Sequence, residues 1–90
     1  MAQRKQTEKK SPEKVFRIGF VSASVFPHEV DTENGKRTIR SVSVQKRYLD
    51  GDDPKYTSSF NLSELPQAIR ALQLAQGYIE RLEAEVPLND

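Results

Sequence analysis

The chain has 90 residues, no cysteine, one histidine and a net charge of +1. This length holds one small domain, excludes a second independent core and makes an isolated domain marginal in stability. The lack of cysteine excludes disulfides and thiolate metal sites, and a single histidine disfavours zinc. No apolar run approaches the roughly 20 residues of a membrane helix, and the polar N-terminal stretch lacks a signal-peptide core. We therefore expect a soluble, cytoplasmic protein without membrane contact, metal or cofactor.

Charge is distributed unevenly along the sequence. Residues 1–14 carry a net charge of +3, residues 36–48 carry +5 with no acid, and residues 63–90 carry −3. A local excess of positive charge can form an anion-binding surface on a nearly neutral protein, although a solvated strand face explains the same run. Residues 1–14 contain only one Met and one Ala as apolar residues, which predicts a disordered basic tail.

An alternating pattern begins at Val15 and indicates β-strands. In the first long strand, apolar side chains share one face, and hydroxyl-bearing or aromatic side chains share the other: Val21, Ala23 and Val25 against Ser22, Ser24 and Phe26. Gly19 predicts a bend, a bulge or a boundary between two short strands. Because Pro27 cannot donate a backbone hydrogen bond, we expect the strand to lie at an edge or to leave the sheet there.

Two turns separate the strands that follow. Residues 30–36 are predicted to form a loop in which Asn34 and Gly35 make a type I′ turn, because both tolerate a positive φ angle. β-Branched residues then predict a second long strand over residues 37–49. The run Asp-Gly-Asp-Asp-Pro after it is dense in turn-forming residues, and a third strand is predicted over residues 55–62.

The C-terminal third is predicted to form one long helix. Ser63 can cap its N-terminus, Pro66 fits the first turn, and the helix is expected to end near Pro87. Apolar residues form two stripes on this helix: Leu65, Ile69, Leu72, Ile79 and Val86 in one, and Ala71, Leu74, Tyr78 and Leu82 in the other. One small sheet can cover only one of these stripes, so we predict that a second surface packs against the other stripe. We expect a homodimer joined through the helix, with Leu74, Tyr78 and Leu82 facing the partner. The alternative is a monomer in which both stripes pack on a curved sheet.

No residue pattern predicts catalysis. His28 stands alone, without a second histidine for a metal or a signature nucleophile for a triad. Asp50, Asp52 and Asp53 lack the spacing and the closing glutamate of a calcium loop, so we interpret them as a solvated turn. We therefore expect a protein that is not an enzyme and has no metal site. A cation-dependent hydrolase built on these aspartates is the remote alternative.

The polar face of the predicted strands is the most informative feature. Serine and threonine alternate with apolar residues on three consecutive strands, accompanied by aromatic and basic residues. Small hydroxyls can donate to phosphates, aromatic rings stack on bases, and arginines neutralise a nucleic-acid backbone. An ordinary solvent-facing sheet surface has a similar composition. The candidate nucleic-acid-binding residues are Ser22, Ser24, Phe26, Lys36, Arg37, Arg40, Gln45, Lys46, Arg47, Tyr48 and Lys55.

Four segments, taken in order, carry a family resemblance. They are Phe16-Arg17-Ile18-Gly19, Val21-Ser22-Ala23-Ser24-Val25-Phe26, Val42-Ser43-Val44-Gln45-Lys46-Arg47-Tyr48 and Ser59-Phe60-Asn61-Leu62-Ser63-Glu64. Over about residues 16–85 the chain resembles the transcriptional positive cofactor four family of single-stranded-DNA-binding domains, structural relatives of the Whirly proteins. The resemblance implies a ββββα fold, a dimer joined largely through the helices and a curved sheet face that grips single-stranded nucleic acid. It also implies that Phe26 and Tyr48 stack on bases, with Gln45 or Arg47 at a basic position.

We therefore predict an α+β domain, in which a twisted antiparallel sheet of three to four strands packs on one long C-terminal helix. The domain is expected to span residues 15–86, between the basic tail at 1–14 and a short C-terminal tail at 87–90. The predicted function is nonenzymatic binding of single-stranded DNA, with RNA left open, in transcription, replication or repair. The alternative is a protein-interaction module of the same fold, which the acidic hairpin at residues 28–33 and the near-neutral charge favour.

Overall fold

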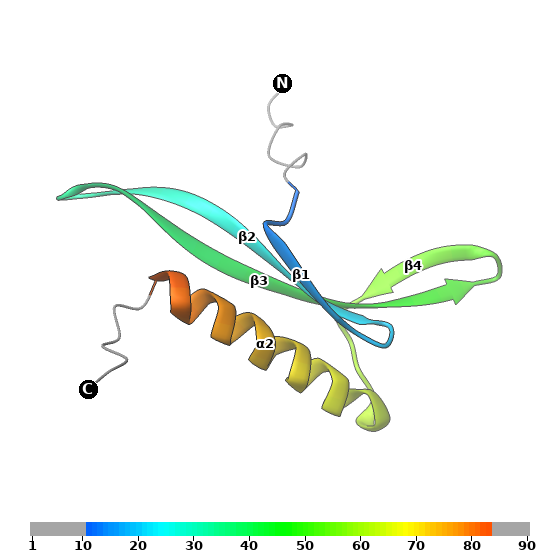
Figure 1. Ribbon diagram of the computed structural model, residues 1–90. Helices are drawn as coiled ribbons and strands as arrows, with labels where there is room; N and C mark the ends of the chain where they lie inside the picture. Colours follow the sequence, from blue (N-terminus) through cyan, green and yellow to red (C-terminus); the bar gives the residue numbers. More distant parts are fainter. Residues whose placement is uncertain (1–10, 84–90) are drawn as a thin grey trace, which may run out of the picture.

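The computed structural model describes residues 11–83. Its elements are β1 (Lys14–Ile18), β2 (Val21–Thr32), β3 (Gly35–Asp50), β4 (Asp53–Thr57), a 3-10 turn η1 (Leu62–Glu64) and the helix α2 (Leu65–Glu83). The strands form one antiparallel sheet in the order β1-β2-β3-β4, and α2 packs on one face of it (Figure 1). The predicted ββββα order and the antiparallel sheet are thereby confirmed.

The predicted termini fall largely outside the described residues. The predictions that lie outside the described residues concern positions 1–10 of the basic tail, Val86 of the first helical stripe, the helix end near Pro87 and the tail at 87–90. At the N-terminal boundary β1 begins at Lys14, and the backbone N–H of Glu13 donates to the carbonyl oxygen of Val25 at 2.7 Å.

Two-residue turns connect the strands. Gly19 occupies the first position of the turn between Ile18 and Val21 with a φ of 62°, and Phe20 follows it with a negative φ. A glycine at this position is what a type II′ hairpin turn requires. Gly19 is therefore the boundary between two strands, one of the possibilities that the sequence indicated.

The turn between β2 and β3 differs from the predicted one. Thr32 pairs with Gly35, so the loop residues are Glu33 and Asn34, and neither has a positive φ. The type I′ turn at Asn34 and Gly35 is therefore wrong. Gly35 follows the loop with a φ of 109°, an arrangement typical of a type I turn closed by glycine. The Thr32 hydroxyl supports it by accepting from the Asn34 N–H at 3.2 Å and donating to the Gly35 carbonyl at 2.6 Å.

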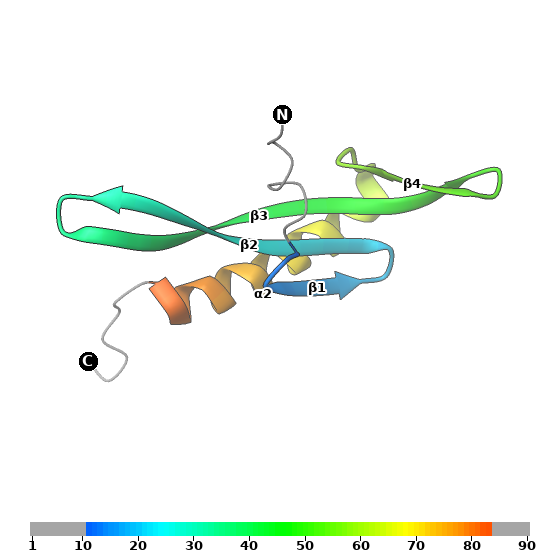
Figure 2. The ribbon, with the colours of Figure 1, turned by 90° about the horizontal axis from the view of Figure 1, so that it is seen from above.

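Strand lengths also differ from the predicted ones. β2 continues through Pro27 to Thr32, so the loop predicted from position 30 is largely strand. Pro27 is tolerated because β1 stops pairing at Val25, which leaves the outer edge of β2 without a partner strand there. Together β2 and β3 form a long ribbon whose tip extends beyond the helix (Figure 2). β4 ends at Thr57 rather than at position 62.

The helix begins at a different cap from the predicted one. Asn61, not Ser63, is the N-cap of η1: its side-chain oxygen accepts from the Glu64 N–H at 3.2 Å. Glu64 completes a capping box, because its carboxylate accepts from the Asn61 N–H at 2.9 Å. The Ser63 hydroxyl donates to the Asn61 side-chain oxygen at 2.8 Å, so it supports the cap instead of forming it.

The core between sheet and helix is built from small side chains. Its fully buried members are Val21, Ala23, Val25, Ala68, Ala71 and Ala75. The three alanines lie at i, i+3 and i+7 on one side of α2; Ala71 belongs to the second predicted stripe, and Ala68 and Ala75 lie between the two stripes. Short side chains on this line let the helix lie close to the sheet. Larger residues surround the line as a half-buried rim: Phe16, Ile18, Val42, Val44, Phe60, Tyr78 and Ile79.

The described part of the molecule is flat. It measures 50 × 46 × 16 Å, and its radius of gyration is 16.1 Å against about 11 Å for a compact domain of this size. The two hairpins extend beyond the small region where sheet and helix meet (Figures 1 and 2). No helix within residues 11–83 combines the length and the apolar character needed to cross a membrane.

Candidate nucleic-acid interface

The sheet has one face that turns toward the helix and one open face. Directly paired residues of an antiparallel sheet point to the same side, so the register assigns each strand residue to a face. β2 places Val21, Ala23 and Val25 on the helix side. The open face consequently carries Val15 and Arg17 from β1, Ser22, Ser24 and Phe26 from β2, Ser41, Ser43, Gln45 and Arg47 from β3, and Tyr56 from β4.

Charged residues are sorted between these two faces. The acidic residues within the strands all have helix-side positions: Glu29, Asp31, Asp50 and Asp53. The open face has the three arginines Arg17, Arg37 and Arg47 and no strand acid. None of the three forms an ion pair with another residue of the described range 11–83. The open face is therefore the electropositive side of the sheet.

Four of the helix-side cations, in contrast, are matched with acids, while the fifth, Lys14, lies over the Phe16 ring. Lys46 Nζ lies 2.7 Å from a Glu64 carboxylate oxygen. Near the ribbon tip the Lys36 ammonium lies 3.2 Å from Asp31, and at the β3–β4 turn the Lys55 ammonium lies 3.7 Å from Asp50. Of the predicted binding residues, Lys36, Arg40, Lys46, Tyr48 and Lys55 therefore lie on the side opposite to Ser22, Ser24, Phe26, Arg37, Gln45 and Arg47.

Arg40 is a structural tie between sheet and helix. Its Nε donates to both Glu13 carboxylate oxygens at 3.0 and 3.1 Å, and its Nη1 lies 3.5 Å from Glu83 at the end of α2. The Tyr78 hydroxyl donates to the same Glu13 carboxylate. The hydrogen bonds from Tyr78 and Arg40 lower the pKa of the Glu13 carboxyl group. In turn, the hydrogen bond that each of them donates to Glu13 raises the pKa of Arg40 and of Tyr78. The Arg40 guanidinium is thus occupied by protein carboxylates.

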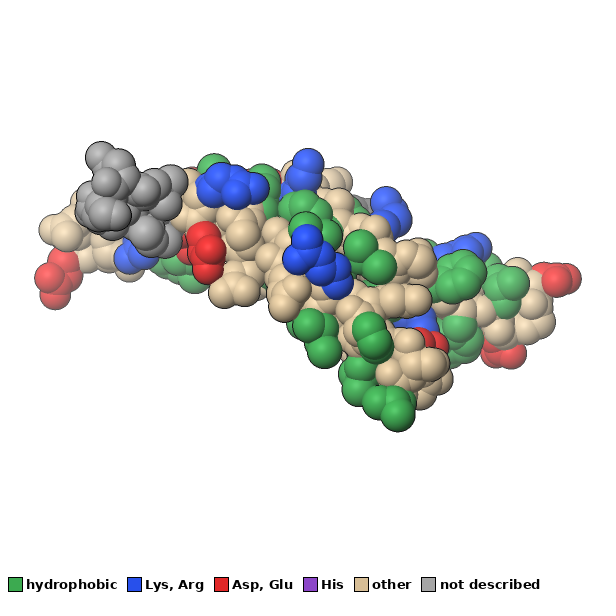
Figure 3. All heavy atoms as spheres, turned by 60° about the horizontal axis from the view of Figure 1, so that its bottom comes forward, with side chains coloured by type: hydrophobic (Ala, Val, Ile, Leu, Met, Phe, Trp, Pro, Cys, Tyr) green, Lys and Arg blue, Asp and Glu red, His purple; other side chains and the backbone are tan. Residues whose placement is uncertain are grey.

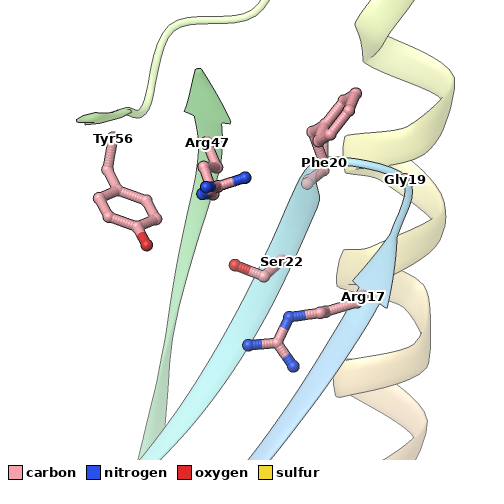
Figure 4. A pocket seen from close by; sticks show the side chains of 7 residues that line it. Arg17, Gly19, Phe20, Ser22, Arg47 and Tyr56 are labelled. Carbon is pink, nitrogen blue, oxygen red and sulfur yellow. The ribbon is translucent and has the colours of Figure 1, made fainter. Parts of the chain in front are cut away.

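A shallow pocket of about 210 Å³ lies on the open face, and each of the four strands contributes to its lining. Arg17 comes from β1, Ser22 from β2, Arg47 from β3 and Tyr56 from β4, and their side chains surround one hollow (Figure 4). The Gly19–Phe20 turn closes its end, where the Arg47 N–H donates to the Phe20 carbonyl at 3.0 Å. The pocket therefore combines two guanidinium groups, a hydroxyl and the exposed Tyr56 ring, while the exposed Phe20 ring at its end points away from the hollow (Figure 4).

These groups can bind a phosphodiester and the base next to it. Guanidinium groups and hydroxyls donate to phosphate oxygens, and an exposed ring offers a stacking surface to any base. Tyr56 is 58% exposed and Phe20 is 69% exposed, so both rings are accessible. In β2, Phe26 follows Ser22 by four residues on the same face, a separation of about 13 Å. A second aromatic position is therefore available further along the open face.

Five residues that line this pocket were not among the predicted ones, and three of them have side chains that can bind a ligand: Arg17, Phe20 and Tyr56. Their positions depend on the tight turns. A two-residue turn at Gly19 pairs Arg17 with Ser22, and the turn after Asp50 pairs Tyr56 with Arg47. Glycine in both turns was the signal that could have found them, because a fixed turn length determines the register of a hairpin.

The helix stripe predicted to face a partner has mixed surroundings. Tyr78 packs edge-to-face on Phe16 of β1, with ring centroids 5.9 Å apart. Leu74 is half-buried and Leu82 is exposed. The apolar residues exposed on α2 are mainly on its other flank, at Leu65, Ile69 and Leu72. Figure 3 shows hydrophobic side chains gathered at the surface where the helix begins.

No protein-family model matches the chain, and no curated protein or solved structure shows significant similarity to it. The resemblance to the transcriptional positive cofactor four family therefore stays a prediction. Within residues 11–83, no cluster of histidine, aspartate and glutamate has a geometry that could hold a metal ion.

Proposed function

We propose that the protein binds single-stranded nucleic acid on the open face of its sheet. One observation supports this proposal above all: four side chains, one from each strand, surround a single pocket on a face that has no acidic strand residue. They are Arg17, Ser22, Arg47 and Tyr56. Two unpaired arginines neutralise the backbone, and the aromatic rings stack on splayed bases. A base-paired duplex hides its base faces, so stacking of this kind selects a single strand.

The acidic hairpin does not oppose this function. Glu29 and Asp31 have helix-side positions, and the Asp31 carboxylate is neutralised by Lys36. Glu33 lies in the turn at the far tip of the ribbon, at the opposite end of β2 from the pocket. The local charge at the pocket is therefore set by Arg17 and Arg47 and not by the hairpin.

A protein-interaction role is the second candidate. It is favoured by the exposed flank of α2, where Leu65, Ile69 and Leu72 present apolar surface. Contiguous exposed apolar residues often mark a contact with another protein. The two roles use different faces of the molecule, so they can be tested separately.

Binding of a fluorescent oligo-dT at several salt concentrations tests the proposal. If Arg17, Arg37 and Arg47 each neutralise one phosphate, log K should fall with log salt with a slope of about −2, at roughly −0.7 per phosphate. Replacing Arg17 and Arg47 together by alanine is expected to weaken binding and to reduce this slope by about 1.4. Arg70→Ala is the matched control, because Arg70 lies exposed on the helix, where its guanidinium donates to the neighbouring Gln73 side chain.

Equal loss of affinity in Arg70→Ala and in the double variant would contradict an open-face site. Absence of any oligo-dT binding by the wild-type chain would leave the interaction role as the better interpretation. Competition with oligo-dA and oligo-U then measures base and sugar preference.

A further inference from the structure

The backbone of β3 has a long free edge. Because the Arg47 N–H donates to Phe20, the odd-numbered residues of β3 direct their backbone groups toward β2, and the even-numbered ones direct theirs away. From Lys46 onward, β4 pairs with those outward groups. Val44 receives a hydrogen bond on its carbonyl from the Ser58 hydroxyl at 3.0 Å. Lys36, Thr38, Arg40 and Val42 have no partner for their outward groups among the described residues.

The other edges of the sheet are short or interrupted by proline. Pro27 removes an N–H from the outer edge of β2, and Pro54 removes one from the outer edge of β4. β1 has only five residues. Proline and short length are common means of protecting an edge against pairing with another chain. The edge of β3 from Lys36 to Val42 lacks both, and it is therefore the edge most open to strand addition.

We propose that two copies of this chain pair antiparallel through the β3 edges, about a twofold axis at Ile39. In this register Lys36 lies opposite Val42 of the second copy and Thr38 lies opposite Arg40. Ile39 lies opposite its own counterpart. Four hydrogen-bonded pairs then form, with about eight backbone hydrogen bonds. This pairing satisfies every free outward group between Lys36 and Val42.

The side chains of the edge suit a second copy. On the open face the two Ile39 side chains, each 37% exposed, cover one another, and Arg37 lies opposite Ser41 rather than opposite another cation. On the helix side the cations near the axis are Lys36, paired with Asp31, and Arg40, paired with Glu13 and Glu83. Like charges directly opposite one another would oppose strand pairing, and this register contains none.

The small core gives a physical reason for such pairing. Six small residues form the fully buried part, and the radius of gyration exceeds that of a compact domain. Joining two β3 edges makes one sheet of eight strands with both open faces on the same side, because the twofold axis is perpendicular to the sheet. The inference does not require nucleic-acid binding, since it rests on the backbone edge alone.

A single-cysteine scan of the full chain tests the register, and the absence of native cysteine keeps the readout clean. Ile39 would form a non-hydrogen-bonded pair with its counterpart, with Cα atoms about 4.5 Å apart, a separation that a disulfide can bridge. Ile39→Cys is therefore expected to form a disulfide-linked dimer under mild oxidation. Ser43→Cys is the matched control on the same strand and face, because its opposite residue is Gly35 and it has no nearby thiol. Ile69→Cys reports instead on pairing through the exposed helix flank.

Thr38→Pro gives an independent measurement. Thr38 directs its N–H to the free edge, so proline there removes no hydrogen bond within the chain, and circular dichroism checks that the fold persists. We expect a sedimenting mass twice that of one chain for the wild type and the mass of one chain for Thr38→Pro. The proposal would be overturned if Ile69→Cys crosslinks and Ile39→Cys does not. It would equally be overturned by a wild-type chain that is monomeric at tens of micromolar, or by a folded Thr38→Pro variant that stays dimeric.

Discussion

Tyr48 and Tyr56 are exposed tyrosines on neighbouring strands with opposite orientations. Tyr56 pairs with Arg47 and lies on the open face, whereas Tyr48 pairs with Lys55 and lies on the helix side. We expect Tyr56→Ala to weaken oligo-dT binding by about 1–3 kcal/mol through the loss of base stacking. Tyr48→Ala is expected to leave the affinity unchanged, which fluorescence anisotropy can measure. The reverse ranking would place the nucleic acid on the helix side of the sheet, where Tyr48 lies.

Acid is expected to destabilise the fold through two carboxylates. The pKa of Glu64 is lowered by the hydrogen bond from Lys46 and by the Asn61 N–H, and that of Glu13 is lowered mainly by Tyr78 and Arg40. A depressed pKa in the folded state means that the stabilisation is complete above the usual carboxyl value of 4.5 and is lost as the pH falls through the lowered pKa. The melting temperature should therefore fall below about pH 4.5.

The matched variant for this acid dependence is Glu13→Gln. Its melting temperature should be lower at neutral pH and should vary less between neutral and acidic pH than that of the wild type. An unchanged acid dependence in Glu13→Gln would show that its contacts with Arg40 and Tyr78 do not stabilise the fold.

Side-chain roles were predictable from the sequence only where the partner is local. Ser22, Ser24 and Phe26 were placed on one face correctly, because alternation along a strand is a local property. Arg40 and Lys46 were assigned to the binding surface because they lie in a run of positive charge. Their acidic partners are far away in the sequence, at Glu13, Glu83 and Glu64, so only the tertiary structure shows that these cations are occupied.

At the scale of elements, two glycines are expected to respond oppositely to alanine. Gly77 lies inside α2, and a Cβ there would meet no atom within 4 Å, so Gly77→Ala should stabilise the fold by about 0.5–1 kcal/mol. Gly19 has a φ of 62°, and its Cβ would lie 3.2 Å from the Gln67 side-chain oxygen. Gly19→Ala should therefore destabilise by about 1–2 kcal/mol. Urea unfolding of both variants measures the difference, and a stabilised Gly19→Ala would refute the turn geometry.

The existence and order of the elements were easier to predict than their ends. Alternation and turn residues predicted the hairpins, yet β2 passes through Pro27 because the outer edge of that strand has no partner there. The helix was predicted from its two apolar stripes. Its sheet-facing line is made of alanines instead, because the close approach of helix and sheet leaves room only for small side chains. Hydrophobicity alone does not measure that distance, so the sequence pattern favoured the larger residues.

For the whole molecule, the N-terminal boundary can be tested by deletion. Deleting residues 1–10 is expected to leave the melting temperature nearly unchanged, because Met1 and Ala2 are the only apolar residues they offer for burial. Deleting residues 1–14 should lower it, because this removes Glu13 and its contacts with Arg40 and Tyr78. Thermal unfolding of the two truncated chains gives the answer. Equal melting temperatures for the two would show that the Glu13 contacts are dispensable.

The ribbon that extends beyond the helix divides the molecule into regions of different local stability. Near Val21–Val25, β2 is buried between β1, β3 and α2, whereas near the Glu33–Asn34 turn the strands have only each other and the Lys36–Asp31 pair. Backbone amides at the tip should consequently exchange with deuterium by local fraying, and those near Ala23 only by global unfolding. The tip of the β2–β3 ribbon can then open or change its twist while the core near Val21–Val25 stays folded. One short chain thus has a stable region between sheet and helix and a less stable ribbon tip that can adjust to a partner.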